Sequence, residues 1–227
     1  ALSALAFYVA FDIVRRVARV SGACLADFGH EVTCVDSNAE KIAALKRNEI
    51  PIYEPGLDQL VKDNATAARM FFSTDLAAAV GNSDVVFIAV GTPSRRGDGH
   101  ADLSYVYAVA REVALALKGF TVVATKSTVP LGTGDEVERI IREINPAADV
   151  AVVSNPEFLR EGSAIGDFKK PDRIVIGLSD DRARAVMTEV YRPLYLNQAP
   201  LLFTARRSAE LIKYAANAFL ALKISFI

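Results

Sequence analysis

The stretch Val85–Pro93, VVFIAVGTP, joins six apolar residues to a glycine–threonine–proline turn. An unbroken apolar run of this length is typical of a central strand in a parallel sheet, which is buried on both faces. Glycine lets a ligand approach the backbone, and proline stiffens the turn. An ordinary turn has the same composition, so Gly91, Thr92 and Pro93 alone leave a ligand site and a plain loop equally open.

On both sides of this stretch, short apolar runs alternate with helical patterns. We expect strands at 32–35, 70–72, 85–90, 120–124, 150–153, 174–176 and 201–203, with a possible first strand within 5–11. We expect helices at 39–47, 57–67, 76–80, 103–117, 134–144 and 182–191, and a last one from about residue 208. This alternation predicts an α/β fold with a Rossmann-like, doubly wound, mostly parallel sheet, which binds ligands at the carboxyl ends of its strands.

The composition narrows the function classes. The chain has 227 residues, of which 52% are hydrophobic and 23% charged, so we expect a full globular core. The net charge is −1 and there is no basic stripe, which argues against nucleic acid as a partner. No apolar segment is long enough to predict a membrane span. The two cysteines, Cys24 and Cys34, and only two histidines suit no metal site, and the thiols read as reduced and buried in a cytosolic protein.

Polar residues follow several of the expected strands. Asp36 ends the run 32–35, where an acidic side chain accepts hydrogen bonds from an adenosine ribose in dinucleotide folds; an ordinary strand-end or helix N-cap aspartate is the alternative. Ser127 and Thr128 follow the run 120–124, where a hydroxyl could orient water or a nicotinamide amide. A Ser/Thr cap of the next helix is the alternative there, and the two roles are compatible.

The segment Asn155–Gly162, NPEFLREG, follows the run 150–153. It holds two carboxylates, a guanidinium and two large apolar side chains within eight residues, which favours a site over a solvated turn. On the last helix, Lys213 and Asn217 are four residues apart and therefore share a face. An ammonium beside an amide suits stabilisation of an oxyanion. From spacing alone, however, an exposed polar stripe is the favoured reading of that helix.

Seven segments together resemble the UDP-glucose/GDP-mannose dehydrogenase family, within it the UDP-glucose branch, and span about residues 21–227. They are SGACLADFGHEVTCVD, IPIYEPGL, VVFIAVGTPS, TKSTVPLGT, SNPEFLREGSAIGDF, PDRIVIG and ELIKYAANAFLALKISFI. The resemblance implies a cofactor, NAD, and oxidation of a sugar C6 alcohol to a carboxylate in two hydride transfers. For the UDP-glucose branch the reaction converts UDP-glucose, two NAD+ and water to UDP-glucuronate through a thiohemiacetal and a thioester on a cysteine.

The resemblance also implies roles for particular residues. The cofactor set would comprise Asp36, Lys41, Gly91, Thr92, Pro93, Ser127, Thr128 and Glu161. The substrate set would comprise Glu157, Phe158, Leu159, Arg160, Glu161, Lys213 and Asn217. Catalytic roles would fall to Thr128, which helps to orient the water, to Glu161 in base chemistry, to Lys213 at the C6 oxyanion, and to Asn217, which assists Lys213.

The chain departs from the family pattern in two respects. Where the family has a G-x-G-Y-V-G phosphate loop, residues 13–18 read IVRRVA, so we expect weak NAD binding. The sequence stops at Ile227 in mid-pattern, and neither Cys24 nor Cys34 matches the family's nucleophile. We therefore expect an NAD-binding domain over 1–205, the start of a connecting helix over 206–227, and no turnover by these residues alone.

Three alternatives stay open: a GDP-mannose enzyme, a non-catalytic Rossmann-like scaffold, and a related dehydrogenase with a lysine mechanism and no cysteine. The expected partners are UDP-glucose and, in an intact enzyme, a second copy of the chain, because the family commonly dimerises through the connecting helix.

Overall fold

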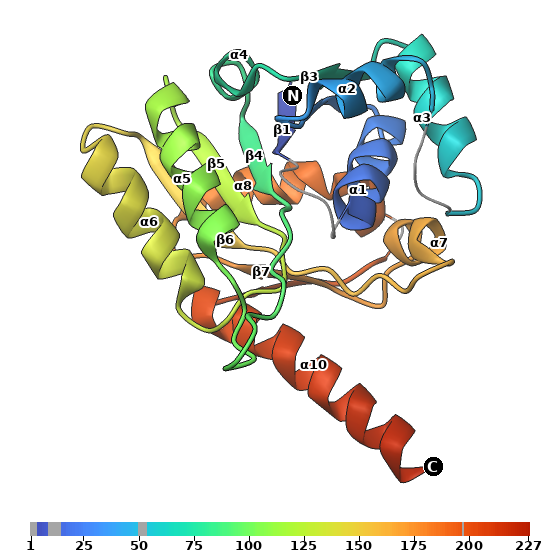
Figure 1. The fold of residues 1–227 in the computed structure, drawn as a ribbon, viewed down its shortest axis with the longest axis vertical. Coiled ribbons are helices and arrows are strands. Elements are labelled where there is room, and N and C mark those ends of the chain that lie inside the picture. Colours follow the sequence, from blue (N-terminus) through green and yellow to red (C-terminus); the bar gives the residue numbers. More distant parts are fainter. Residues whose placement is uncertain (1–3, 9–14, 50–53, 197) are drawn as a thin grey trace.

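The computed structural model describes residues 4–8, 15–49, 54–196 and 198–227, with the side chains of 4–8 and 15–19 left aside. In these ranges eight strands form one sheet in the order β3-β2-β1-β4-β5-β6-β7-β8 (Figure 1). The strands are β1 Ala4–Tyr8, β2 Glu31–Val35, β3 Met70–Ser73, β4 Val85–Ile88, β5 Thr121–Thr125, β6 Val150–Ser154, β7 Ile174–Gly177 and β8 Leu201–Thr204. Neighbouring strands are parallel except β6 and β7, which meet antiparallel at Ser154 and Gly177.

Helices connect the strands and cover both faces of the sheet. They are α1 Arg15–Asp27, α2 Ala39–Lys46, α3 Leu57–Thr66, α4 Leu76–Val80, α5 Ser104–Ala116, α6 Thr133–Ile144, α7 Ala164–Lys169, α8 Asp181–Val190, α9 Arg192–Leu196 and α10 Arg206–Phe226. The expected α/β, doubly wound sheet is thus confirmed. The expected helices did not include α1, and they also missed α7 and α9, which are only six and five residues long and too short to show a helical period.

The apolar run at β4 is buried because both of its faces are covered. Val85 and Phe87 face a core formed with α1, α3, α7 and α8, whereas Val86 and Ile88 face a second core formed with α4, α5 and α6. All four side chains are completely buried. The alternation of faces along a strand therefore accounts for the unbroken run that predicted a central position.

The strand order reverses beside β1, which lies between β2 and β4. This is the switch point at which doubly wound sheets bind ligands, outside the carboxyl ends of the strands. Asp36 follows β2, Gly91 comes shortly after β4, and Lys126 follows β5. Of the expected phosphate-loop positions 13–18, residues 13 and 14 lie outside the described residues, and at 15–18 only the backbone is described.

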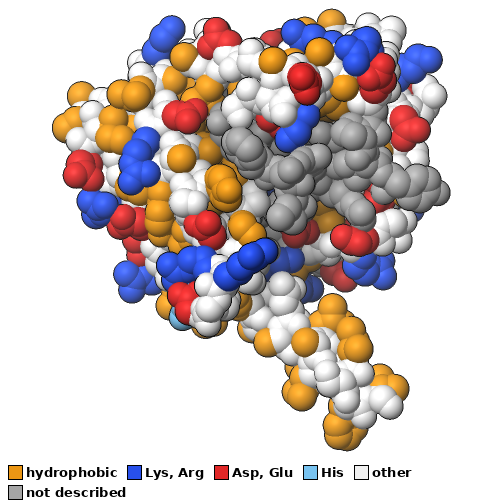
Figure 2. Space-filling model, in the orientation of Figure 1, with side chains coloured by type: hydrophobic (Ala, Val, Ile, Leu, Met, Phe, Trp, Pro, Cys, Tyr) orange, Lys and Arg blue, Asp and Glu red, His pale blue; other side chains and the backbone are white. Residues whose placement is uncertain are grey.

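The last helix, α10, packs on the sheet through its first two turns and then projects away from it (Figure 1). Ala209, Glu210 and Lys213 are buried against the domain. Beyond them the projecting part carries apolar side chains on its surface (Figure 2). These side chains are 56–102% exposed and comprise Phe219, Leu220, Leu222, Ile224, Phe226 and Ile227.

Within the described ranges, no helix combines the length and the apolar character that crossing a membrane requires.

Candidate active site

A cleft of about 760 Å³ lies between α10 and the segment that follows β6. Its lining includes Glu157, Phe158, Leu159, Arg160, Lys213 and Asn217. These are six of the seven residues that the sequence assigned to a substrate site. They come from parts of the chain more than fifty residues apart, so the fold brings together what the sequence kept separate.

Lys213 and Glu157 form the polar centre of this cleft. Lys213 Nζ donates to Glu157 Oε1 at 3.3 Å, and the two side chains are only 9% and 13% exposed. Glu157 Oε2 accepts from the backbone N–H of Leu159 at 2.5 Å, which closes a tight turn in the segment. The reading of Lys213 as part of an exposed stripe is therefore wrong, because tertiary packing buries it. Asn217, one turn further along, is exposed but lines the same cleft.

Phe158 lies among cationic groups. The Arg173 guanidinium is 4.5 Å from the centroid of its ring and the Lys213 ammonium 5.1 Å from it. Such contacts are attractive because the ring face carries partial negative charge. Lys170 and Lys223 also line the cleft, so cations outnumber carboxylates around it, an environment suited to an anionic ligand.

Arg160 and Glu161 lie at the far end of the segment. Arg160 is exposed and forms a two-pronged ion pair with Asp167 of α7, with N···O distances of 2.7 and 3.1 Å. The hydrogen bonds from Arg160 hold the pKa of the Asp167 carboxyl below its usual range. Glu161 is exposed and directly precedes Gly162. Its assignment to both cofactor and substrate stays a prediction, because it does not line the cleft described above.

The members of the cofactor set that follow β4 and β5 lie together. Thr92 Oγ1 donates to the Thr128 carbonyl at 2.9 Å, and Ser127 Oγ donates to the Val90 carbonyl at 2.7 Å. These bonds fasten the loop after β4, which includes Gly91 and Pro93, to the loop after β5.

Asp36 lies next to this edge, at the end of β2 beside β1, and its role at the ribose of NAD stays a prediction. It is 4% exposed, and its Oδ1 accepts from the Asn38 N–H at 2.9 Å. Asn38, rather than Asp36, caps α2 by accepting from the Lys41 N–H, so the N-cap alternative for Asp36 is wrong. Lys41 itself lies in the first turn of α2. The side chains at the phosphate-loop positions 13–18 are not among those described, so the fit to NAD rests on the residues at this edge of the sheet.

A buried cation that the sequence analysis did not assign lies beneath the cleft. Lys126, 3% exposed, donates to Asn155 Oδ1 at 3.3 Å and to the Tyr191 hydroxyl at 3.2 Å. Its ammonium lies 5.7–5.9 Å from the centroids of the Phe87, Phe168 and Tyr191 rings. The one signal in the sequence was its place directly before Ser127. Tyr191 lies at the end of an ordinary amphipathic helix, and the sequence contains no signal for its role.

Two buried glutamates were also missed. Glu210 accepts from the N–H groups of Gly132 and Gly134 at 2.6 and 2.8 Å, and from Ser154 Oγ at 3.2 Å. It thereby ties α10 to the start of α6, one turn before Lys213. Glu54, the second glutamate, is bound to the end of the segment that carries Glu161.

The two cysteines are buried in the core, 0% and 3% exposed. Burial raises the pKa of the Cys24 thiol to about 12, with Lys169 lowering it and Asp27 raising it to smaller extents. A protonated, buried thiol is a poor nucleophile. The described ranges also contain no cluster of three or more His, Cys, Asp or Glu side chains placed to hold a metal ion.

This raised pKa predicts a loss of stability in alkali. Between about pH 9 and pH 12 the unfolded chain releases the Cys24 proton while the folded chain keeps it, so the free energy of unfolding falls as pH rises. The expected slope is about 1.4 kcal/mol per pH unit relative to Cys24→Ala. Urea unfolding of both proteins at pH 8 to 10.5 measures it, and parallel curves would contradict the raised pKa.

Comparison with known proteins identifies the family. Residues 16–195 match the UDP-glucose/GDP-mannose dehydrogenase family, NAD binding domain. A UDP-glucose 6-dehydrogenase of Rhizobium meliloti (strain 1021) is 74% identical over 213 residues, which are 93% of this chain and 49% of that protein. The chain spans about half the length of the curated relatives it matches.

Solved structures lead to the same family. A UDP-glucose dehydrogenase from Pyrobaculum islandicum has a TM-score of 0.91 at 42% identity, covering 99% of this chain and 51% of that one. A ternary complex of GDP-mannose dehydrogenase from Pseudomonas aeruginosa has a TM-score of 0.91 at 36% identity, covering 98% and 51%. The chain therefore belongs to the UDP-glucose/GDP-mannose dehydrogenase family and contains that family's NAD binding domain.

Proposed function

We propose that this chain supplies the NAD-binding half, and one wall of the substrate site, of a UDP-glucose 6-dehydrogenase that forms UDP-glucuronate. The observation that carries the proposal is the cleft in which Lys213, Glu157 and Asn217 meet, between α10 and the segment that follows β6. The 74% identity to the Rhizobium meliloti enzyme favours UDP-glucose over GDP-mannose.

The side chains divide the chemistry between them. NAD, when bound, would accept a hydride from the sugar C6. Lys213 would hold the negative charge that develops on the C6 oxygen, because its nearly buried ammonium has few competing waters. Glu157 would hold that ammonium in place, and Asn217 would donate a second hydrogen bond. Thr128 and Glu161 would orient and activate the water that hydrolyses the covalent intermediate.

The nucleophile of that intermediate would come from outside this chain. Cys24 is buried in the core with a raised pKa, and Cys34 is 3% exposed in the same core. A non-catalytic scaffold is the second candidate, favoured by the absence of glycine at positions 13–18.

We also infer that α10 is a connecting helix and that its projecting part pairs with a second copy of the chain. The inference rests on the apolar side chains that its projecting part exposes (Figure 2). The division into a domain over 1–205 and a separate helix from 206 belongs to the same proposal.

A chimera tests the proposal. The chain is joined to the half of the Rhizobium meliloti enzyme that it does not match, and NADH formation from UDP-glucose and NAD+ is followed by absorbance. We expect turnover by the chimera and none by residues 1–227 alone, for which calorimetry should show NAD binding weaker than micromolar. An inactive but folded chimera would favour the scaffold. GDP-mannose as the better substrate would contradict the choice of sugar.

A further inference from the structure

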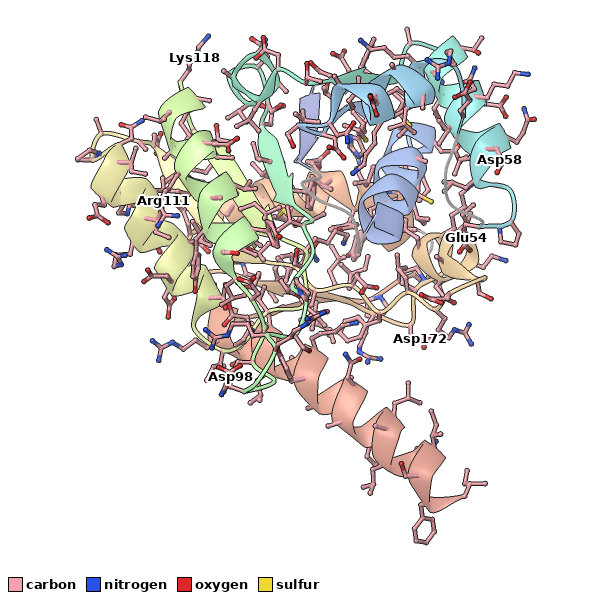
Figure 3. The ribbon with its side chains drawn as sticks, viewed as in Figure 1. Glu54, Asp58, Asp98, Arg111, Lys118 and Asp172 are labelled. Atoms are coloured by element: carbon pink, nitrogen blue, oxygen red, sulfur yellow. The ribbon has the colours of Figure 1, made fainter. Side chains whose placement is uncertain are left out.

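Glu54 is a buried carboxylate that forms no ion pair with the other described side chains. It is 2% exposed, and its two oxygens accept from the N–H groups of Gly162 at 3.1 Å and Ala164 at 2.8 Å. These residues lie 108 and 110 positions further along the chain. Glu54 lies beside α7, across the loop that follows β6 (Figure 3).

Burying a carboxylate costs free energy, and hydrogen bonds from N–H groups to the charged acceptor offset that cost. The two hydrogen bonds of Glu54 are therefore strong, and they hold backbone N–H groups rather than a side chain. Gly162 has a φ of +77°, a conformation that side-chain-bearing residues rarely adopt. Gly162 is the third residue of a turn that the Ser163 N–H closes by donating to the Arg160 carbonyl at 3.3 Å, and Glu54 accepts from the Gly162 N–H from outside this turn.

The hydrogen bond to Gly162 has a direct consequence for its neighbour. The peptide unit that carries the Gly162 N–H also contains the Glu161 carbonyl, and this unit is planar. Holding the N–H in place therefore fixes the backbone orientation of Glu161. At the other end of the segment, Glu157 is fixed by Leu159 and Lys213. The end that carries Glu161 is held on one side by Asp167, which binds the Arg160 N–H and guanidinium, and on the other side by Glu54.

We propose that Glu54 is a positioning residue for Glu161: by binding the Gly162 and Ala164 amides it sets where the Glu161 carboxylate stands during hydrolysis. This inference rests on the proposed function, which gives Glu161 its role in base chemistry. Glu54 belongs to the IPIYEPGL segment, to which the sequence analysis assigned no role of its own.

The substitution Glu54→Gln tests the inference in the chimera. Glutamine keeps the shape but offers one acceptor oxygen and a donor amide, so one of the two backbone N–H groups loses its partner. We expect kcat to fall about tenfold to a hundredfold, with KM for NAD+ unchanged, because a misplaced catalytic group lowers the rate without altering cofactor binding. Amide exchange in the peptide containing Gly162 and Ala164 should become faster by a similar factor.

A double-mutant cycle with Glu161→Gln separates positioning from general destabilisation. If Glu54 acts through Glu161, Glu54→Gln will have little further effect once Glu161 is already replaced. Asp58→Asn is the matched control, since Asp58 is an exposed carboxylate in the first turn of α3, close to Glu54 (Figure 3). It should leave both kcat and amide exchange unchanged.

The outcomes are distinguishable. Equal losses of kcat in the parent and in the Glu161→Gln background, or no loss in either, would overturn the inference while leaving the proposed function intact. A folded parent chimera without turnover would overturn the proposed function and this inference with it. Wild-type activity in Asp58→Asn together with the expected pattern at Glu54 supports the inference.

Discussion

In the chimera, Lys213→Met is expected to lower kcat for UDP-glucose oxidation about 100- to 1,000-fold, the effect of removing one donor to a developing oxyanion. The Lys213 ammonium lines the cleft, is hydrogen-bonded to Glu157 at 3.3 Å and is nearly buried. In the Lys213→Met variant, water therefore does not readily take over the role of the lost donor. Initial rates of NADH formation at saturating NAD+ measure the loss. A loss below about tenfold would remove Lys213 from the reacting centre.

The same substitution leaves Glu157 without its partner, which alone destabilises a buried pair by about 3 kcal/mol or more. The double variant Lys213→Met/Glu157→Gln removes the unpaired charge and should recover thermal stability without recovering turnover. Lys118→Met provides the matched control. Lys118 is exposed beyond the end of α5, on the opposite side of the domain from α10 (Figure 3), and its substitution should change neither property.

The sequence predicted the central sheet well because its signals are local. The runs at 85–90 and 150–153 are apolar throughout, and the run at 120–124 is apolar except for Thr121; the structure places them in β4, β6 and β5 with both faces covered. The six-residue helix α7 has no comparable signal. Its start is held by Glu54, a contact between residues more than one hundred positions apart that no local pattern contains.

The sequence indicated candidate side chains for the site, and topology predicts the position of only some of them. Asp36, Thr92 and Thr128 follow strands, so their position at one edge of the sheet follows from topology. The burial of Lys213 depends on how α10 docks, and its spacing from Asn217 suggested an exposed stripe instead. The buried acceptors Glu54 and Glu210 bind backbone amides of distant loops, and the sequence carries no mark of such bonds.

The docking of α10 connects the two halves of the site. Glu210 binds the start of α6, which follows the loop of Thr128, and Lys213 lies three residues further along α10 in the cleft. Arg206, at the first turn of α10, forms ion pairs with Asp135 and Glu138 of α6. The position of the first two turns of α10 therefore sets the distance between the switch-point edge and the cleft.

Gly177→Ala is expected to lower the free energy of unfolding by about 3 kcal/mol, because this docking leaves no room for a side chain on β7. A Cβ atom at Gly177 would lie 2.6 Å from Ala209 Cβ, 2.7 Å from Arg206 Cα and 2.9 Å from the Ala205 carbonyl oxygen. Urea unfolding of residues 1–227 measures the change. Gly119→Ala is the control, since no neighbouring heavy atom lies within 4 Å of its Cβ position, and it should change stability by less than about 0.5 kcal/mol.

Adding Ala209→Gly to Gly177→Ala shows which contact matters. Ala209→Gly removes the contact at 2.6 Å but leaves the backbone contacts of Arg206 and Ala205, and glycine inside a helix costs about 1 kcal/mol. We therefore expect less than half of the lost stability to return. Full recovery would mean that α10 tolerates a side chain at Gly177 and that its backbone does not fix the spacing. If the backbone does fix it, Gly177→Ala in the chimera will also lower kcat, because Lys213 moves with the helix while Thr128 stays with β5.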